Sequence, residues 1–134
     1  MSTFQVEIVT PERKVYESQA NMVVVNGVEG QLGIMPNHIP LVTPLKIAPV
    51  SIQREGGSDV IAVSGGFVEV RKDKVVILAE SAELAEDINV ERAEAAKQRA
   101  NSRLSLAKSD EIDFRRAELS LQRAMNRLNI KHTK

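Results

Sequence analysis

Hydrophobic and polar residues alternate along the first 80 or so residues of the chain. Phe4, Val6 and Ile8 alternate with polar neighbours, which is the period-2 pattern of a strand buried on one side. Similar short runs follow, separated by turn-forming residues. They predict strands at about 4–8, 22–25, 30–34, 50–53, 60–63, 67–71 and 75–78. Since no helix-length periodic segment interrupts them, we expect an antiparallel β-sandwich or barrel rather than a parallel α/β sheet.

Gly, Pro, Asn and Asp mark the turns between these predicted strands. Asn26–Gly27 is a strong hairpin-turn dipeptide, Pro36–Pro40 bounds a loop, and Lys72–Asp73 predicts a further turn. We also predict a tight turn at Ser64–Gly66. Its glycines do not open a helix and are not followed by the Lys-Ser/Thr pair of a phosphate-binding loop.

After residue 87 the pattern takes the helical period. Gly and Pro are absent from 88–134, where the helix formers Ala, Arg, Glu and Leu dominate. A first helix is expected over about 90–107, with Asp87 or Asn89 as its N-cap, and a second from about 110 to 129. The second follows a break at Lys108, with Ser109 or Asp110 as its N-cap. The predicted class is therefore α+β, with an N-terminal antiparallel β-sandwich (1–87) and a C-terminal antiparallel two-helix hairpin (88–134).

Small apolar residues recur every three or four positions and form a seam along each predicted helix. An Ala-rich seam lets two helices approach closely but buries little area, at roughly 0.8 kcal/mol per CH₂. We therefore expect a hairpin that can open. The seam residues are Ala93, Ala96, Ala100, Leu104 and Ala107 in the first helix, and Phe114, Ala117, Leu121, Ala124 and Leu128 in the second.

Composition narrows the class of function. Of 134 residues, 43% are hydrophobic and 27% charged, which is typical of a soluble globular chain. The 3% aromatic content and the absence of Trp argue against a base-stacking surface for nucleic acid. The absence of Cys excludes disulfides, thiolate zinc sites and cysteine nucleophiles, and fits a reducing cytoplasm. No signal-peptide pattern or membrane-length apolar run is visible, so we expect membrane association only through a partner and no direct insertion.

The zero net charge conceals an asymmetry. Residues 1–88 carry 7 basic and 12 acidic side chains, a balance of −5, whereas residues 89–134 carry 11 and 6, a balance of +5. The change of sign indicates two modules with different partners, although two solvated faces that simply differ would give the same numbers.

The sequence contains no set of catalytic or metal-binding residues at a spacing typical of an active site. The two histidines, His38 and His132, lack metal-ligand spacing with another candidate. Glu86 and Asp87 lie where negative charge stabilises a helix start, which explains them without acid–base chemistry. We therefore expect a non-catalytic protein.

Arginines form one stripe on each predicted helix. If the helices pack antiparallel, two guanidinium rows converge beside the seam, and guanidinium forks bind phosphate. Spacing alone favours the simpler interpretation, a solvated face with i,i+4 pairs to Glu. The stripes are Arg92, Arg99 and Arg103, and Arg116, Arg123 and Arg127.

Segments 30–41, 64–70 and 115–128 resemble the epsilon subunit of bacterial F-type ATP synthase, above all in Bacillus-like bacteria, and the resemblance runs along the whole chain. It implies a sandwich followed by a helical hairpin, in a peripheral subunit at the cytoplasmic face of the cell membrane. The sandwich would bind the gamma subunit and the c-ring in the central stalk, which couples ion-driven rotation to ATP synthesis. The contact positions would be Leu32, Gly33, Met35, Pro36, His38 and Ile39.

The resemblance also implies a movable hairpin. Its extended form would reach the alpha and beta catalytic subunits and inhibit ATP hydrolysis, through Arg115, Arg116, Arg123 and Arg127. In some bacterial members the folded hairpin binds ATP as a regulatory ligand, with or without Mg²⁺. The motif Ile/Leu-Asp-x-x-Arg-Ala reads Ile88–Ala93 here, with Asn89 in place of Asp. The implied nucleotide positions are Glu83, Ile88, Asn89, Arg92, Ala93, Arg99, Arg123 and Arg127.

Two alternatives to an ATP-sensing regulatory subunit stay open at this point. One is a purely structural stalk subunit whose hairpin binds no nucleotide. The other is a free-standing nucleotide sensor in which the sandwich is only a scaffold. Nucleotide titration tests the first, and co-purification with gamma tests the second.

Overall fold

The computed structural model describes the backbone of residues 2–106 and 111–133, and the side chains of 2–105 and 114–131. The chain divides into two compact units, Met1–Leu84 and Ala85–Lys134. The division falls three residues before the boundary expected from the sequence. The reason is a short 3-10 helix, η1 (Ala85–Asp87), which packs against the second helix of the hairpin and so joins the second unit.

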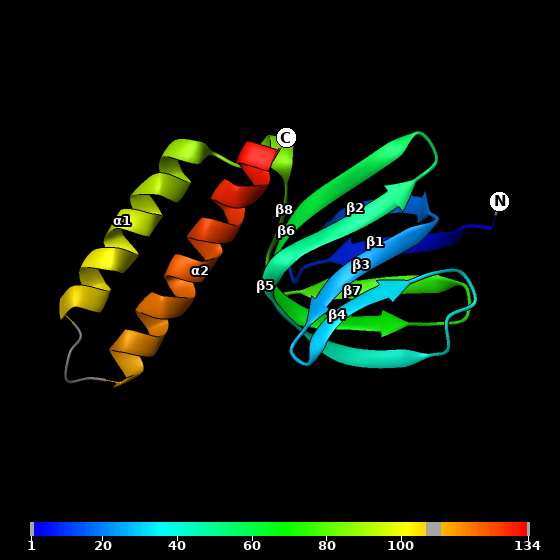
Figure 1. Ribbon diagram of the computed structural model, residues 1–134, viewed down its shortest axis with the longest axis horizontal. Coiled ribbons are helices and arrows are strands. Elements are labelled where there is room, and N and C mark those ends of the chain that lie inside the picture. The colour runs from blue at the N-terminus through cyan, green and yellow to red at the C-terminus, as the bar shows by residue number, and fades with distance from the viewer. Residues whose placement is uncertain (1, 107–110, 134) are drawn as a thin grey trace. The chain divides into compact units, whose positions relative to one another are not determined.

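The first unit is built from strands alone, as expected (Figure 1). In sheet order they run β2-β1-β7-β6-β5-β3-β4, with β8 also paired to β6. Neighbouring strands are antiparallel except β1 and β7, which pair in parallel. The strands are β1 (Phe4–Val9), β2 (Lys14–Ala20), β3 (Met22–Gly27), β4 (Gly30–Ile34), β5 (Leu41–Arg54), β6 (Gly57–Val70), β7 (Lys74–Ala79) and β8 (Ala82–Leu84).

Two long strands, β5 and β6, pair along their whole length and run through both layers of the sandwich. The start of β5 and the end of β6 share a layer with β7, β1 and β2, and their other halves share the second layer with β3, β4 and β8. The core lies between the layers. It confirms the period-2 pattern, because Phe4, Val6 and Ile8 are all buried.

The tight turn predicted at Ser64–Gly66 is wrong. Those residues lie inside β6, where Gly65 and Gly66 adopt positive φ angles of 82° and 130°. A Cβ atom at Gly66 would overlap the carbonyl oxygen of Leu78 on the neighbouring strand. The glycines therefore bend a continuous strand and let its neighbour come close, rather than ending it.

The hairpin turn predicted at Asn26–Gly27 is also misplaced. Both residues stay in β3, paired with Gln31 and Gly30, and the turn is formed by Val28 and Glu29. The Asn26 amide instead donates a hydrogen bond to the Pro49 carbonyl at 3.1 Å. The side chain that favours a turn is used here to join two strands.

Three further strand segments were not predicted, and one of them is the three-residue β8. β2 has no clean alternation, and the first nine residues of β5 contain Pro44 and Pro49, which argue against a central strand. Both prolines lie at or beside the interruption in β3–β5 pairing, between the Val24–Ser51 and Gly27–Leu45 pairs. The carbonyls of both prolines accept hydrogen bonds there. Val28 N–H donates to the Pro44 carbonyl, and the Asn26 side-chain amide donates to the Pro49 carbonyl.

The second unit is the expected helical hairpin, formed by α1 (Val90–Leu106) and α2 (Glu111–Thr133) lying side by side (Figure 1). α2 ends four residues later than predicted. Asn89 is the N-cap of α1, because its side-chain oxygen accepts a hydrogen bond from Arg92 N–H at 3.0 Å. The expected caps Ser109 and Asp110, the break at Lys108 and the seam residue Ala107 lie outside the described residues.

The Ala-rich seam is confirmed with one exception. Phe114 is 44% exposed, because it lies one turn before the buried stretch of α2 and does not join the seam. Ala96, Leu104 and Leu121 are half-buried. The fully packed seam residues are Ala93 and Ala100 of α1, and Ala117, Ala124 and Leu128 of α2.

Candidate functional site

The loop between β4 and β5 presents two exposed apolar side chains. Met35 is 60% and Ile39 76% exposed. A turn holds the loop, since His38 N–H donates to the Met35 carbonyl at 3.2 Å and Asn37 takes a left-handed φ of 69°. His38 Nδ1 lies 2.7 Å from the Ile39 carbonyl and donates to it in the tautomer that carries the hydrogen on Nδ1. We call residues 35–40 the contact loop.

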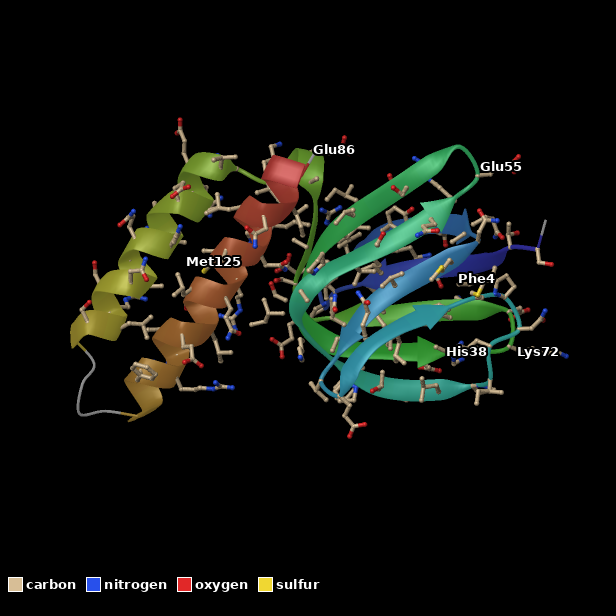
Figure 2. The ribbon with its side chains drawn as sticks, viewed as in Figure 1. Phe4, His38, Glu55, Lys72, Glu86 and Met125 are labelled. Atoms are coloured by element: carbon tan, nitrogen blue, oxygen red, sulfur yellow. The ribbon has the colours of Figure 1, made fainter. Side chains whose placement is uncertain are left out.

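Of the other predicted contact positions, Pro36 and His38 are half-buried in the loop itself. Leu32 is half-buried and Gly33 exposed on the adjoining edge strand, β4. The pairing of Leu41 with Val70 places the contact loop and the β6–β7 turn at the same end of the sheet, where Figure 2 labels His38 and Lys72. A cation therefore borders the contact loop.

Sequence reasoning missed an apolar patch on the outward face of the sandwich. Pro44, Phe67 and Leu78 lie opposite one another on β5, β6 and β7, and Val42 follows two residues from Pro44 on the same face. Val42 is 65%, Phe67 51% and Leu78 47% exposed. The available signal was Phe67, one of only three phenylalanines, which occupies an outward position beside inward Val68. We call these four residues the apolar patch; such exposed groups mark interaction surfaces.

A network of charges borders the apolar patch on the same face. Val9 pairs with Leu78, and two residues earlier on β1 the buried carboxylate of Glu7 accepts hydrogen bonds from Lys14 at 2.6 Å and from Lys74. Those bonds, first from Lys14 and then from Lys74, lower the Glu7 pKa from 4.5 to about 2. Glu7 in turn raises the pKa of Lys14. The patch therefore has a fixed, ionised rim.

The arginine stripes lie along both helices of the hairpin. Arg92, Arg99 and Arg103 are exposed on α1; on α2 Arg116 is exposed, and Arg123 and Arg127 are half-buried. Arg115 pairs within its own helix, with its Nη1 at 2.6 Å from the Glu118 carboxylate. In an antiparallel hairpin the start of α1 lies beside the end of α2, which brings Arg92 and the pair Arg123 and Arg127 to one end.

The remaining predicted nucleotide positions have distinct surroundings. Ile88 and Ala93 are buried, so Ala93 contributes to the seam and exposes little side chain. The side-chain oxygen of Asn89 is used for the helix cap. Glu83 lies half-buried on β8, paired with Ala62, and thus in the first unit rather than the second.

The part of the chain that the structure describes contains neither a metal-ligand cluster nor a membrane-spanning helix. No cluster of three or more His, Asp or Glu side chains is arranged to hold a metal ion in residues 2–106 and 111–133. Over the same ranges, neither helix has the length and apolar character required to cross a membrane.

Comparison with known proteins accounts for nearly the whole chain. Residues 3–85 match the β-sandwich domain of the ATP synthase delta/epsilon chain, and residues 86–131 match the long α-helix domain of the same chain. The ATP synthase epsilon chain of Brevibacillus brevis is 64% identical over 106 residues, 78% of this chain and 80% of the relative. That of Bacillus subtilis is 56% identical over 110 residues, 82% and 83% of the two chains.

Solved structures share the fold. A chain in the mitochondrial ATP synthase of Euglena gracilis, determined with OSCP, F1 and the c-ring, superposes with a TM-score of 0.80 at 21% identity, over 94% of this chain and 79% of that one. A chain from the central stalk and c-ring of the Tetrahymena thermophila enzyme gives 0.60 at 13% identity, over 95% of each. With two family domains matched in order and relatives above 50% identity, the chain belongs to the family of ATP synthase epsilon chains.

Proposed function

We propose that this epsilon chain is a non-catalytic central-stalk subunit that binds gamma and the c-ring through its sandwich. The observation that carries the proposal is the apolar patch, an exposed line of Val42, Pro44, Phe67 and Leu78. Burying a side chain of this size contributes roughly 1.5–3 kcal/mol, so an exposed line of four needs a partner surface. The contact loop, with Met35 and Ile39, extends the apolar surface available to the c-ring.

The hairpin is the regulatory part of this proposal. Its seam is mostly Ala, which supports an opening and closing hairpin. Its +5 balance suits acidic surfaces on the alpha and beta subunits, with Arg115, Arg116, Arg123 and Arg127 as contacts. The extended hairpin inhibits ATP hydrolysis, and the subunit works at the cytoplasmic face of the cell membrane.

ATP is the proposed regulatory ligand of the folded hairpin. Arg92, Arg99, Arg123 and Arg127 supply guanidinium groups for its phosphates. Asn89 is nearer the base, with Ile88, Ala93 and Glu83. A ligand that binds only one state shifts the equilibrium by its differential affinity, so plentiful ATP favours the folded, non-inhibitory hairpin.

Docking is tested by Phe67→Ser with Val28→Ser as its matched control, because both side chains are 51% exposed but Val28 lies in the β3–β4 turn, outside the apolar patch. We expect Phe67→Ser to weaken gamma binding by about ten- to a hundred-fold, measured by calorimetry, and Val28→Ser to leave it unchanged. Equal losses in the two variants, or none in either, would contradict docking through the patch.

The nucleotide site is tested with Asn89→Asp and Arg127→Ala. Asp keeps the helix cap with one oxygen and offers a second, charged oxygen, so we expect ATP to bind about tenfold more tightly. Arg127→Ala should weaken ATP binding, whereas Arg115→Ala, whose arginine pairs with Glu118, serves as the control. Calorimetry that finds no ATP binding by the parent but binding by Asn89→Asp would favour the purely structural subunit.

A further inference from the structure

The last turn of α2 is joined to the turn that precedes α1. Lys131 Nζ donates a hydrogen bond to the Ala85 carbonyl at 3.1 Å, between residues 46 positions apart. The same carbonyl accepts the Ile88 N–H at 3.3 Å, which closes the η1 turn. This one ammonium–carbonyl bond, the end clasp, therefore closes a loop of chain that contains both helices.

The surroundings of the end clasp strengthen it. Ala85 and Ile88 are buried, and so is Ile130, which precedes Lys131 in the chain. A hydrogen bond from a charged donor is stronger where water is partly excluded. The ammonium also lies in the last turn of α2, where the carbonyl ends of the helix favour a cation.

The seam between the two helices buries mostly small side chains. The packed seam has four alanines and one leucine, so its two helices gain little from each other's burial. If Lys131 leaves, the buried Ala85 carbonyl keeps only the longer bond from Ile88 N–H. An under-satisfied buried carbonyl is unfavourable, so the bond from Lys131 favours the closed hairpin.

We propose that Lys131 is a latch: its bond to Ala85 holds the hairpin closed in the absence of nucleotide, and the hairpin extends only when this bond breaks. The consequence for regulation rests on the proposed function, in which the extended hairpin is the inhibitor. Opening also releases the ammonium of Lys131. The latch thus withholds one positive charge from an acidic partner until the hairpin extends.

Amide hydrogen exchange of the full chain, without nucleotide, tests the latch directly. Lys131→Met keeps most of the aliphatic length but removes the donor, and we expect roughly tenfold faster exchange at the Ile88 amide and along α1 and α2. Lys131→Arg retains a cationic donor and should exchange like the parent. Lys97→Met removes a cation from α1 of the same hairpin and should also match the parent. Amides of β1 and β6 report whether the sandwich is intact.

Two results would overturn the latch. One is parent-like exchange in Lys131→Met, and the other is equal acceleration by Lys97→Met, which would indicate a general effect of charge. Lys131→Ala is the second donor-free variant and must agree with Lys131→Met.

Hydrolysis by the assembled complex separates the latch from the proposed function. If Lys131→Met opens the hairpin and lowers ATP hydrolysis, both stand. If exchange accelerates and hydrolysis is unchanged, the latch is correct and the inhibitory role of the extended hairpin is wrong. If hydrolysis changes while exchange does not, Lys131 acts by another route and the latch is wrong.

Discussion

Among single residues, Glu7 shows how a buried charge can border an exposed apolar patch. The residue is only 6% exposed, yet two lysines on neighbouring strands keep its carboxylate ionised. Since its pKa falls from 4.5 to about 2 on folding, Glu7 stabilises the folded chain fully above about pH 4.5. That stability is lost as the pH falls through the window between 4.5 and 2.

We predict that Glu7→Gln lowers the free energy of unfolding at pH 7, and that the difference from the parent shrinks towards zero as the pH approaches 2. Urea unfolding at pH 7, 4.5, 3 and 2 measures this. Glu29→Gln, in the exposed β3–β4 turn, is the control and should follow the parent throughout. A difference that stays constant with pH would mean that Glu7 contributes by packing and not by its charge.

At the same scale, the sequence predicted the residues whose role is local. The inward positions of β1 follow from alternation. The start of the helical period narrowed the N-cap of α1 to Asp87 or Asn89, and the structure shows that it is Asn89. It could not predict the outward role of Phe67, because the patch exists only where Pro44, Phe67 and Leu78 come from three strands. Which of these residues lie next to one another is set by the register of strands that are far apart in the sequence.

Among the elements, β6 depends most on its glycines. A side chain at Gly66 meets both an unfavourable φ of 130° and the backbone of β7. We predict that Gly66→Ala destabilises the fold by about 1–3 kcal/mol or more. Gly57→Ala, at the start of the same strand, meets nothing nearer than 3.8 Å and should change stability by only about 0.5 kcal/mol. Thermal unfolding of the two variants measures the difference. Equal melting temperatures for Gly66→Ala and Gly57→Ala would mean that β6 adjusts to a side chain at Gly66.

The turn prediction failed at both Asn26–Gly27 and Ser64–Gly66 for one reason. The residues of each segment favour a turn, but pairing with neighbouring strands keeps both segments within strands. Asn26–Gly27 pairs with Gln31 and Gly30, and Ser64–Gly66 lies between β5 and β7. The helices were predicted more closely, since their periodicity is local. Within the described residues, the end of α2 and the exposure of Phe114 differed from the prediction.

For the whole molecule, the proposed function gives the two units separable tasks. We predict that a chain lacking residues 89–134 still assembles with gamma, because β1 to β8 and the core are complete without them. The same deletion should raise ATP hydrolysis by the complex, since the proposed inhibitory helices are gone. Assembly is measured by co-purification and hydrolysis by phosphate release. Intact assembly with unchanged hydrolysis would remove the inhibitory role, and failed assembly would show that the sandwich does not dock alone.

The two strands shared by both layers bear on how the sandwich carries load. A sandwich held only by side-chain packing can shear, since one sheet slides over the other without breaking a covalent bond. Here the backbones of β5 and β6 pass from one layer into the next, and Tyr16 of β2 donates a 2.7 Å hydrogen bond to Asp59 of β6, which also pairs with Arg54 of β5 at 2.9 Å. A sideways force on the outward face is therefore taken up along the polypeptide itself. The backbones that both layers share thus oppose shear between them, which suits a subunit of the central stalk.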